Sequence, residues 1–280
     1  MAGEPGPERP PERDSELPPI PAAVIFDVDG TLVDSERHGH RVAFNLAFEE
    51  ADLPWRWDEA TYGRLLRITG GQRRLDGYLA DEGVDDDRRA ELVPALHARK
   101  TEILSELVAS GRIELRPGVR ALVDDLVGRG IAVAVATTGS RDWVGGLLER
   151  LLDGVELAAV VTGDEVSARK PDPEAFTVVL DRLGAGVADA VVVEDSAEGL
   201  AAAAAAGLAC VVVVNDYTAE LEADEFGHAE LVVEGFGQPD APARLRADRV
   251  GSGWDGVLDA GVLARVCARG RGSTRRSTAT

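Results

Sequence analysis

The stretch Val24-Ile25-Phe26-Asp27-Val28-Asp29-Gly30-Thr31 places two acids directly after a short apolar run. Such a run predicts a strand buried on both faces, as in a parallel sheet. Open α/β sheets bind ligands at the carboxyl ends of their strands, so we expect Asp27 and Asp29 to converge there, with a turn at Gly30. Two close carboxylates need a cation, and oxygen ligands favour a hard ion such as Mg²⁺. The alternative is a strand that ends in a solvated Asp-Gly turn.

The composition is that of a globular protein with a sizeable core. The chain has 280 residues, of which 45% are hydrophobic, and this suits one large domain with a smaller one. The net charge of −20 argues against nucleic acid or an anionic membrane as a partner. No apolar run approaches the roughly 20 residues of a membrane span, and the acidic, Pro-rich start is unlike a signal peptide. Because Cys210 and Cys267 are too few for a disulfide framework, we expect a cytoplasmic protein. We also expect a monomer.

The pattern divides the chain into four parts. We expect a leader at residues 1–19, an α/β core in two parts at 20–34 and 116–237, a cap at 35–115, and a C-terminal extension at 238–280. The leader holds six prolines and five acids, which predicts disorder. The cap reads as all-helical. The extension is expected to contain one helix near 256–268 and a disordered Arg-rich tail.

Within the core, short apolar segments alternate with single helical patterns, which predicts βαβ units and a Rossmann-like parallel sheet. The fold class is therefore α/β with an inserted all-α cap. Core strands are expected at 22–27, 131–136, 158–162, 190–193 and 210–214, with a last strand at 231–233 at an edge, and core helices at 118–129, 141–152, 173–184 and 196–206. Cap helices are expected from an N-cap at Asp34 or Ser35 to Ala51, and at 58–68, 72–82 and 86–110.

A second strand end carries hydroxyl groups rather than acids. Thr137-Thr138-Gly139-Ser140 follows the strand expected at 131–136 and precedes a helix. Hydroxyls and free backbone amides at a helix entrance suit a phosphate group. Taken alone, the same four residues also fit an ordinary capped turn.

A lysine lies before the next core helix, in Arg169-Lys170-Pro171-Asp172-Pro173. Only Lys100 and Lys170 among the 30 basic residues are lysines. A retained lysine suggests a need for a compact ammonium in place of the planar guanidinium. The alternative is a surface lysine without a role.

A third strand end repeats the opening pattern. Val191-Val192-Val193 runs into Glu194, Asp195 and Ser196, so paired acids again follow an apolar strand. Two acidic strand ends in one sheet predict an all-oxygen metal site more specifically than either one alone.

These four segments, in this order, resemble the four motifs of the haloacid dehalogenase-like hydrolases over about 22–214. The resemblance implies a phosphatase that forms an aspartyl-phosphate and uses Mg²⁺ as its cofactor. It assigns Asp27 as the nucleophile and Asp29 as the general acid and base. The other roles that it implies are binding of the phosphoryl group by Thr137, Thr138 and Lys170, and a Mg²⁺ site formed by Asp27, the backbone carbonyl of Asp29, Asp195 and the supporting carboxylate Glu194.

The cap segments 34–45 and 65–74 resemble those of the CbbY-type branch, as do 167–170 and 216–218. This resemblance implies a sugar bisphosphate substrate, notably xylulose 1,5-bisphosphate. One residue departs from the pattern, since Gln72 stands where a lysine is expected, and Arg73 is the nearest substitute. The branch implies contacts of Glu36 and His40 with sugar hydroxyls, of Arg67 and Arg74 with the distal phosphate, and a close approach of the backbone at Gly70 and Gly71.

Three functions are compatible with these motifs. The first is a Mg²⁺-dependent phosphatase acting on a sugar bisphosphate, and its partner is a small phosphorylated sugar. The second is a phosphosugar mutase of the β-phosphoglucomutase kind, or a phosphatase of the phosphoglycolate type. The third is a non-catalytic binding module, which the complete set of catalytic residues disfavours.

Overall fold

Strand β1 (Ala23–Phe26) lies inside a seven-stranded sheet of order β3-β2-β1-β4-β5-β6-β7. The other strands are β2 (Ala132–Ala136), β3 (Ala159–Val161), β4 (Ala190–Glu194), β5 (Ala209–Val213), β6 (Leu231–Val233) and β7 (Leu245–Asp248). All neighbouring pairs are parallel except β6 and β7. The computed structural model describes residues 19–68, 70–219 and 225–277. The predicted leader therefore lies almost entirely outside the described residues.

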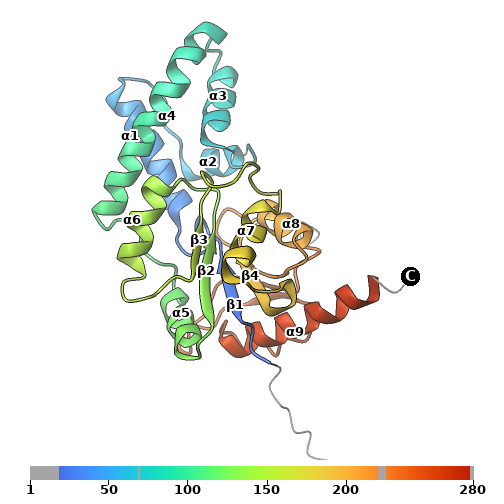
Figure 1. Ribbon diagram of the computed structural model, residues 1–280. Helices are drawn as coiled ribbons and strands as arrows, with labels where there is room; N and C mark the ends of the chain where they lie inside the picture. Colours follow the sequence, from blue (N-terminus) through green and yellow to red (C-terminus); the bar gives the residue numbers. More distant parts are fainter. Residues whose placement is uncertain (1–18, 69, 220–224, 278–280) are drawn as a thin grey trace, which may run out of the picture.

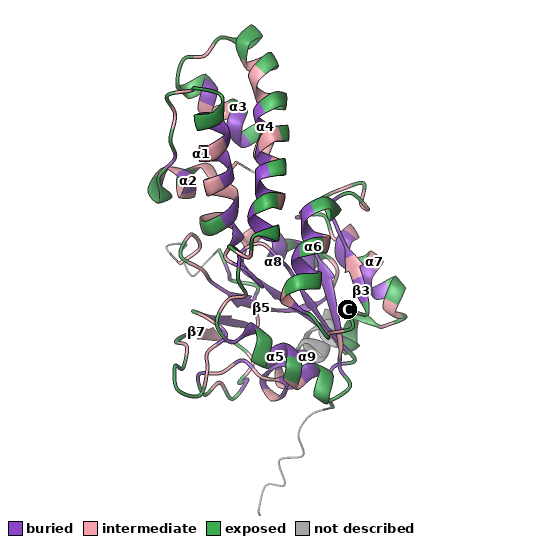
Figure 2. Ribbon diagram, turned by 90° about the vertical axis from the view of Figure 1, so that its left-hand side faces the viewer, coloured by how far each residue is buried: buried purple, intermediate pink, exposed green. Residues whose placement is uncertain are grey.

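Helices cover both faces of the sheet, which explains the uninterrupted apolar strands (Figure 1). On β1, Val24 and Phe26 belong to one hydrophobic cluster, and Ala23 and Ile25 belong to another. The first cluster includes α5 (Val119–Gly128), α6 (Arg141–Leu151) and α9 (Ala260–Ser277), and the second includes α7 (Glu174–Leu183) and α8 (Ala197–Ala205). Figure 2 shows the inner strands of the sheet buried between helices whose outer surfaces are exposed.

Helices of the inserted segment stand above the carboxyl edge of the sheet (Figure 1). They are the π-helix η1 (Glu36–His40), α1 (Arg41–Glu50), α2 (Glu59–Leu65), α3 (Gly71–Asp81) and α4 (Asp86–Ala109). Among the described residues of 35–115, every regular element is thus helical. Aromatic side chains form much of the cap interior, and Trp57 packs against both Phe44 and Phe48. The predicted fold class, a parallel sheet with an all-α insert, is confirmed.

The cap is docked onto the core through contacts from both sides. Arg37 in η1 forms ion pairs with Glu59 in the cap and Asp216 in the core. His40 lies edge-on to Trp143 of α6, with 5.3 Å between the ring centroids. Helix α4 also packs along α6. The carboxyl edge of the sheet therefore lies under the cap.

The segment 238–280 contains the helix expected near 256–268 but otherwise departs from its prediction, because it packs on the core. Strand β7 pairs with β6, so β6 does not form the edge of the sheet. The short sequence of β7, Leu-Arg-Ala-Asp, carries no apolar run because an edge strand is partly exposed. Helix α9 begins at Ala260 and continues to Ser277, through most of the tail that we expected to be disordered.

Two smaller points concern helix properties. Ser35 does not cap the first cap helix, since its hydroxyl bonds Asp29 and the carboxylate of Asp34 accepts from the amide of Arg37. Within the described part of the chain, no helix has the length and apolarity needed to cross a membrane.

Candidate active site

The polar strand ends predicted from the sequence lie at one edge of the sheet. Asp27 follows β1, Thr137 follows β2, Glu194 ends β4 and Asp195 comes next. Strand β1 pairs with both β2 and β4, and the chain crosses from one side of the sheet to the other at this point. Ligands of open α/β sheets bind at such a switch point.

Three carboxylates form a buried cluster at this edge. Oxygen atoms of Asp27, Glu194 and Asp195 all lie within 4.8 Å of one another. Burial raises the pKa of both aspartates, and repulsion from neighbouring carboxylates adds to this effect. A divalent cation would relieve that repulsion, and a donor set made only of oxygen fits a hard ion. The carboxylate of Asp29 is not part of the cluster.

Lys170 links two of these acids. Its Nζ lies 2.7 Å from Asp27 Oδ1, 2.5 Å from Glu194 Oε1 and 2.8 Å from the carbonyl oxygen of Ala136. Burial alone would lower the pKa of Lys170, but the two carboxylates outweigh it and raise the pKa. The ammonium therefore stays charged beside the expected nucleophile.

Glu194 serves mainly to hold Lys170 and the start of α8. Its second oxygen accepts from the amide of Asp195 at 3.1 Å and from the hydroxyl of Ser196 at 3.2 Å. A Cβ at position 199 would lie 2.0 Å from the carboxyl carbon of Glu194, so only glycine fits there. Both oxygens of Glu194 are therefore engaged by protein groups.

Asp195 is oriented by two residues that the sequence analysis did not assign. Thr31 donates to Oδ1 at 3.2 Å, and Asn215 donates to Oδ2 at 2.6 Å. Gly30 has a φ of +82°, and a Cβ there would lie 2.2 Å from Asp195 Oδ2. Thr31 belongs to the octet 24–31, and Asn215 follows β5 at the same edge of the sheet. Their positions after strands were the sequence signal that could have identified them as site residues.

Asp29 faces the cap rather than the acidic cluster. Its carboxylate accepts from the hydroxyl of Ser35 and lies 2.9 Å from His40 Nε2. Burial alone would raise the pKa of Asp29, but His40 and Ser35 outweigh it and hold the pKa below its usual value. The carboxylate of Asp29 is therefore held by Ser35 and by His40 of η1.

Lys100 completes this arrangement from α4. Its Nζ lies 2.5 Å from His40 Nδ1, and burial lowers the pKa of Lys100 to about 8. An ammonium has only donors, so Nδ1 accepts and Nε2 carries the hydrogen directed at Asp29. Both ring nitrogens of His40 are thus engaged. The sequence analysis missed Lys100, although the scarcity of lysine applied to it equally.

The loop after β2 is closed by a hydrogen bond between Gly139 and Thr137. Thr137 is buried, and its hydroxyl oxygen accepts from the amide of Gly139 at 3.0 Å. The hydroxyl hydrogen of Thr137 is then left to donate. Thr138 is half-buried, and its carbonyl lies so close to Gly163 that a Cβ there would be 2.3 Å away. The loop is therefore tightly packed directly before α6.

The cap arginines differ in their surroundings. Arg74 is buried, with Nη1 donating to the hydroxyl of Tyr62 at 3.0 Å and Nε donating to the carbonyl of Leu65 at 3.1 Å. Tyr62 in turn donates to Glu36 Oε2 at 2.5 Å. Arg67 is exposed, so it differs from Arg74 although the sequence analysis gave both one role.

The two cap glycines lie at the start of α3. Gly70 is the N-cap of α3, and its φ is +93°. A Cβ at Gly71 would lie 2.8 Å from His97 Nε2 on α4. Gly71 therefore permits close packing of α3 against α4.

Comparisons with known proteins find relatives that cover most of this chain. Residues 21–207 match the family model of the haloacid dehalogenase-like hydrolases. A CBBY-like protein of Arabidopsis thaliana is 40% identical over 233 residues, covering 80% of this chain and 72% of that protein. The structure of a CbbY variant from Rhodobacter sphaeroides in complex with xylulose-(1,5)bisphosphate has a TM-score of 0.68 at 36% identity, covering 77% of this chain and 95% of that one. A putative beta-phosphoglucomutase from Thermotoga maritima has a TM-score of 0.59 at 28% identity, covering 75% and 93%.

Proposed function

The chain belongs to the haloacid dehalogenase-like hydrolases and is a phosphatase, and we propose that it hydrolyses xylulose 1,5-bisphosphate through an aspartyl-phosphate on Asp27. The observation that carries the chemistry is the 2.7 Å contact between Asp27 and the buried Lys170 inside an acidic cluster. The substrate is supported by the CbbY neighbour that was solved with this bisphosphate. The proposed cation is Mg²⁺.

In the first half-reaction, a carboxylate oxygen of Asp27 attacks the phosphorus and the sugar oxygen leaves. Lys170 offsets the negative charge on the phosphoryl oxygens, and the free hydroxyl hydrogen of Thr137 donates to one of them. Thr138 belongs to the same turn. Asp27, Asp195 and the backbone carbonyl of Asp29 would hold Mg²⁺, with Glu194 as the supporting carboxylate. The cation supplies charge neutralisation at the phosphoryl group.

Asp29 acts as the general acid in the first half-reaction and as the general base in the second. It protonates the departing sugar oxygen and then removes a proton from the water that attacks the aspartyl-phosphate. The carboxylate must first gain a proton. Nε2 of His40 can give one to Asp29 while Nδ1 takes one from the Lys100 ammonium, so that the imidazole stays neutral. Lys100 keeps the other ring nitrogen in its accepting state. His40 and Lys100 thus set the direction of the hydrogen bond to Asp29.

The cap supplies substrate recognition in this proposal. Exposed Arg67 binds the distal phosphate, while Glu36 contacts sugar hydroxyls. Arg74 acts through Tyr62, because its guanidinium is held inside the cap. His40 acts through Asp29, because its two ring nitrogens are engaged by Asp29 and Lys100. Gly70 leaves space beside the backbone for the substrate, while Gly71 lets α3 pack against α4.

A mutase shares this chemistry up to the aspartyl-phosphate, and a phosphoglycolate phosphatase shares all of it. The three differ in the group that accepts the phosphoryl or in the substrate. Free phosphate forms from xylulose 1,5-bisphosphate in the proposed reaction. A mutase would instead convert β-glucose 1-phosphate to glucose 6-phosphate with little free phosphate.

The test measures phosphate release by the purified full-length chain, with and without Mg²⁺. The substrates are xylulose 1,5-bisphosphate, 2-phosphoglycolate, β-glucose 1-phosphate and p-nitrophenyl phosphate. We expect the highest kcat/KM for the bisphosphate, with activity lost in EDTA. Asp27→Asn should abolish turnover because the amide is no nucleophile, and Asp181→Asn on the exposed face of α7 is the matched control.

Two results would contradict the proposal. Turnover by Asp27→Asn at the rate of the Asp181→Asn control would exclude the covalent route. A higher kcat/KM for 2-phosphoglycolate or for mutase conversion would reassign the substrate and leave the phosphoryl chemistry intact.

A further inference from the structure

Residues 110–118 form the second linker between cap and core, and they run beside the loop that follows Asp27. Leu115 forms an antiparallel bridge with Val33, and the amide of Arg116 donates to the carbonyl of Leu32 at 2.9 Å. The linker is therefore fixed to the stretch that continues from the catalytic octet. Arg116 is the residue of the linker whose side chain enters the core.

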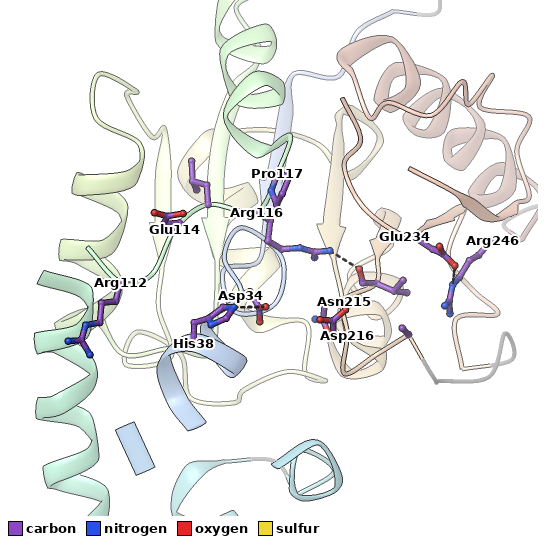
Figure 3. A pocket seen from close by; sticks show the side chains of 13 residues that line it. Asp34, His38, Arg112, Glu114, Arg116, Pro117, Asn215, Asp216, Glu234 and Arg246 are labelled. Atoms are coloured by element: carbon purple, nitrogen blue, oxygen red, sulfur yellow. Dashed lines mark hydrogen bonds and ion pairs between the residues drawn. The ribbon is translucent and has the colours of Figure 1, made fainter. Parts of the chain in front are cut away.

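The Arg116 guanidinium is bound by backbone carbonyls from two separate segments. It donates to the carbonyl of Gly30 in the octet, to that of Val213 at 3.2 Å and to that of Val214 at 2.7 Å. It also lies 5.7 Å from the ring centroid of Phe236. Figure 3 shows Arg116 extending along the wall of a pocket of about 740 Å³ towards the segment that contains Asn215. Among the described residues, no carboxylate forms an ion pair with it.

The two segments that Arg116 joins are the ones that orient Asp195. Asn215 directly follows Val214. Its side-chain nitrogen Nδ2 donates to Asp195 at 2.6 Å and to the Gly30 carbonyl at 3.4 Å. Thr31 directly follows Gly30 and donates to the other oxygen of Asp195. The separation of these two donors therefore depends on the carbonyls that Arg116 holds together.

We propose that Arg116 is a positioning residue for the cation site, which it serves by holding the Gly30 and Val214 segments at the separation that orients Asp195. The inference rests on the cation site of the proposed function. The planar fork of Arg116 reaches the three carbonyls with two separate nitrogens, Nη1 and Nη2, whereas the single nitrogen of a lysine cannot occupy both positions. Partners that orient a metal ligand typically change metal affinity by about 10–100-fold.

The geometric role can be separated from the charge of Arg116. A positive charge near the site opposes a bound cation, so its removal alone would tighten Mg²⁺ binding. Loss of positioning would weaken Mg²⁺ binding in spite of that effect. Arg116→Met and Arg116→Lys therefore distinguish the two, because the first removes charge and fork and the second removes only the fork.

The experiment titrates Mg²⁺ into the chelator-treated full-length chain without substrate and follows binding by isothermal titration calorimetry. We expect Kd to rise about 10–100-fold in both Arg116 variants. Arg112→Met is the matched control, because Arg112 is an exposed arginine of the same linker region and lines the same pocket (Figure 3). Its Kd should equal that of the wild type. At saturating Mg²⁺, kcat of Arg116→Lys should recover, which damage to the fold would not allow.

Unchanged or tighter Mg²⁺ binding by a folded Arg116→Met protein would overturn the inference, as would a wild-type chain that binds no Mg²⁺. Circular dichroism melting shows whether each variant folds, and Arg116→Lys decides if the methionine variant does not. Failure of the wild type to hydrolyse xylulose 1,5-bisphosphate would remove the proposed substrate. It would leave this test intact, because the affinity is measured without substrate.

Discussion

At the scale of the residue, the contact between Lys100 and His40 carries a cost in folding free energy. Lys100 is 5% exposed, and its described side-chain contacts are Nδ1 of His40 and the ring of Phe44. Burial lowers its pKa from 10.5 to about 8, while Glu36 and Asp29 act in the opposite direction. At neutral pH the protein therefore holds a poorly solvated ammonium in order to orient His40.

This lowered pKa predicts an unusual dependence of stability on pH. Between pH 8 and 10.5 the unfolded chain keeps the Lys100 proton and the native protein has lost it, so the contribution of Lys100 to stability rises with pH. One pKa unit corresponds to about 1.4 kcal/mol. The stability of the wild type relative to Lys100→Met should therefore increase by about 2–3 kcal/mol between pH 8 and pH 10.

Urea unfolding of both proteins at several pH values measures this difference. Arg99→Met serves as a control on the same helix, because Arg99 forms ion pairs on the exposed side of α4. Its stability difference from the wild type should not show this rise. Parallel curves for the wild type and Lys100→Met would mean that Lys100 keeps an ordinary pKa.

At the scale of the element, the turn between α2 and α3 presents its arginines differently. Arg74 lies in the first turn of α3 and is directed into the cap, where Tyr62 and Leu65 accept its hydrogen bonds. Arg67 precedes the helix and remains exposed. The same short segment thus contains one arginine that stabilises the cap and one that can meet a ligand.

Substitution of the two arginines should therefore give different results. Arg67→Ala should lower kcat/KM for xylulose 1,5-bisphosphate about tenfold to a hundredfold, since a hydrogen bond to a charged group contributes about 1.5–3 kcal/mol. Its activity on p-nitrophenyl phosphate should not change. Arg74→Ala should lower Tm and impair both substrates, because Tyr62 loses a buried partner.

Steady-state kinetics on both substrates and thermal melting check this prediction. Arg56→Ala, another exposed cap arginine, should resemble the wild type on both substrates. A parallel loss on both substrates in Arg67→Ala would show that Arg67 supports cap folding or closure. It would then not bind a distal phosphate.

At the scale of the whole molecule, the last described helix completes the core. Helix α9 packs against β4, β5 and α5, although it follows every catalytic motif in the sequence. Leu258, Val262, Leu263 and Val266 are buried in the same cluster as the strands. Without it, the part of the sheet face opposite α7 and α8 that is formed by β4 and β5 would be exposed.

Leu263→Ala should therefore destabilise the whole protein. Leu263 is fully buried, and removal of such a side chain costs about 2–5 kcal/mol through lost burial and a residual cavity. Leu245→Ala is the matched control, because Leu245 on the edge strand β7 is 46% exposed and should change stability by less than about 0.5 kcal/mol. Urea unfolding measures both. Equal stability of the two variants would mean that α9 adds little to the core.

Local sequence by itself determined the strands other than β7, most of the helices and the place of the polar strand ends. Apolar runs predict buried strands, and parallel topology brings the carboxyl ends of those strands to one edge. Asp27, Thr137 and Asp195 could therefore be placed together without coordinates. The all-helical insert after the first strand followed from helical periodicity in the same way.

Tertiary structure alone decided which side chains meet across long separations in the chain. Glu194 pairs with Lys170, Lys100 reaches His40 from a helix 60 residues away, and Arg74 is held within the cap. Strand β7 and the extent of α9 likewise depend on a sheet face and edge that no local pattern reveals. The physical reason is that periodicity and turn chemistry are local, whereas the partner of a buried polar group is set by how cap and core pack together.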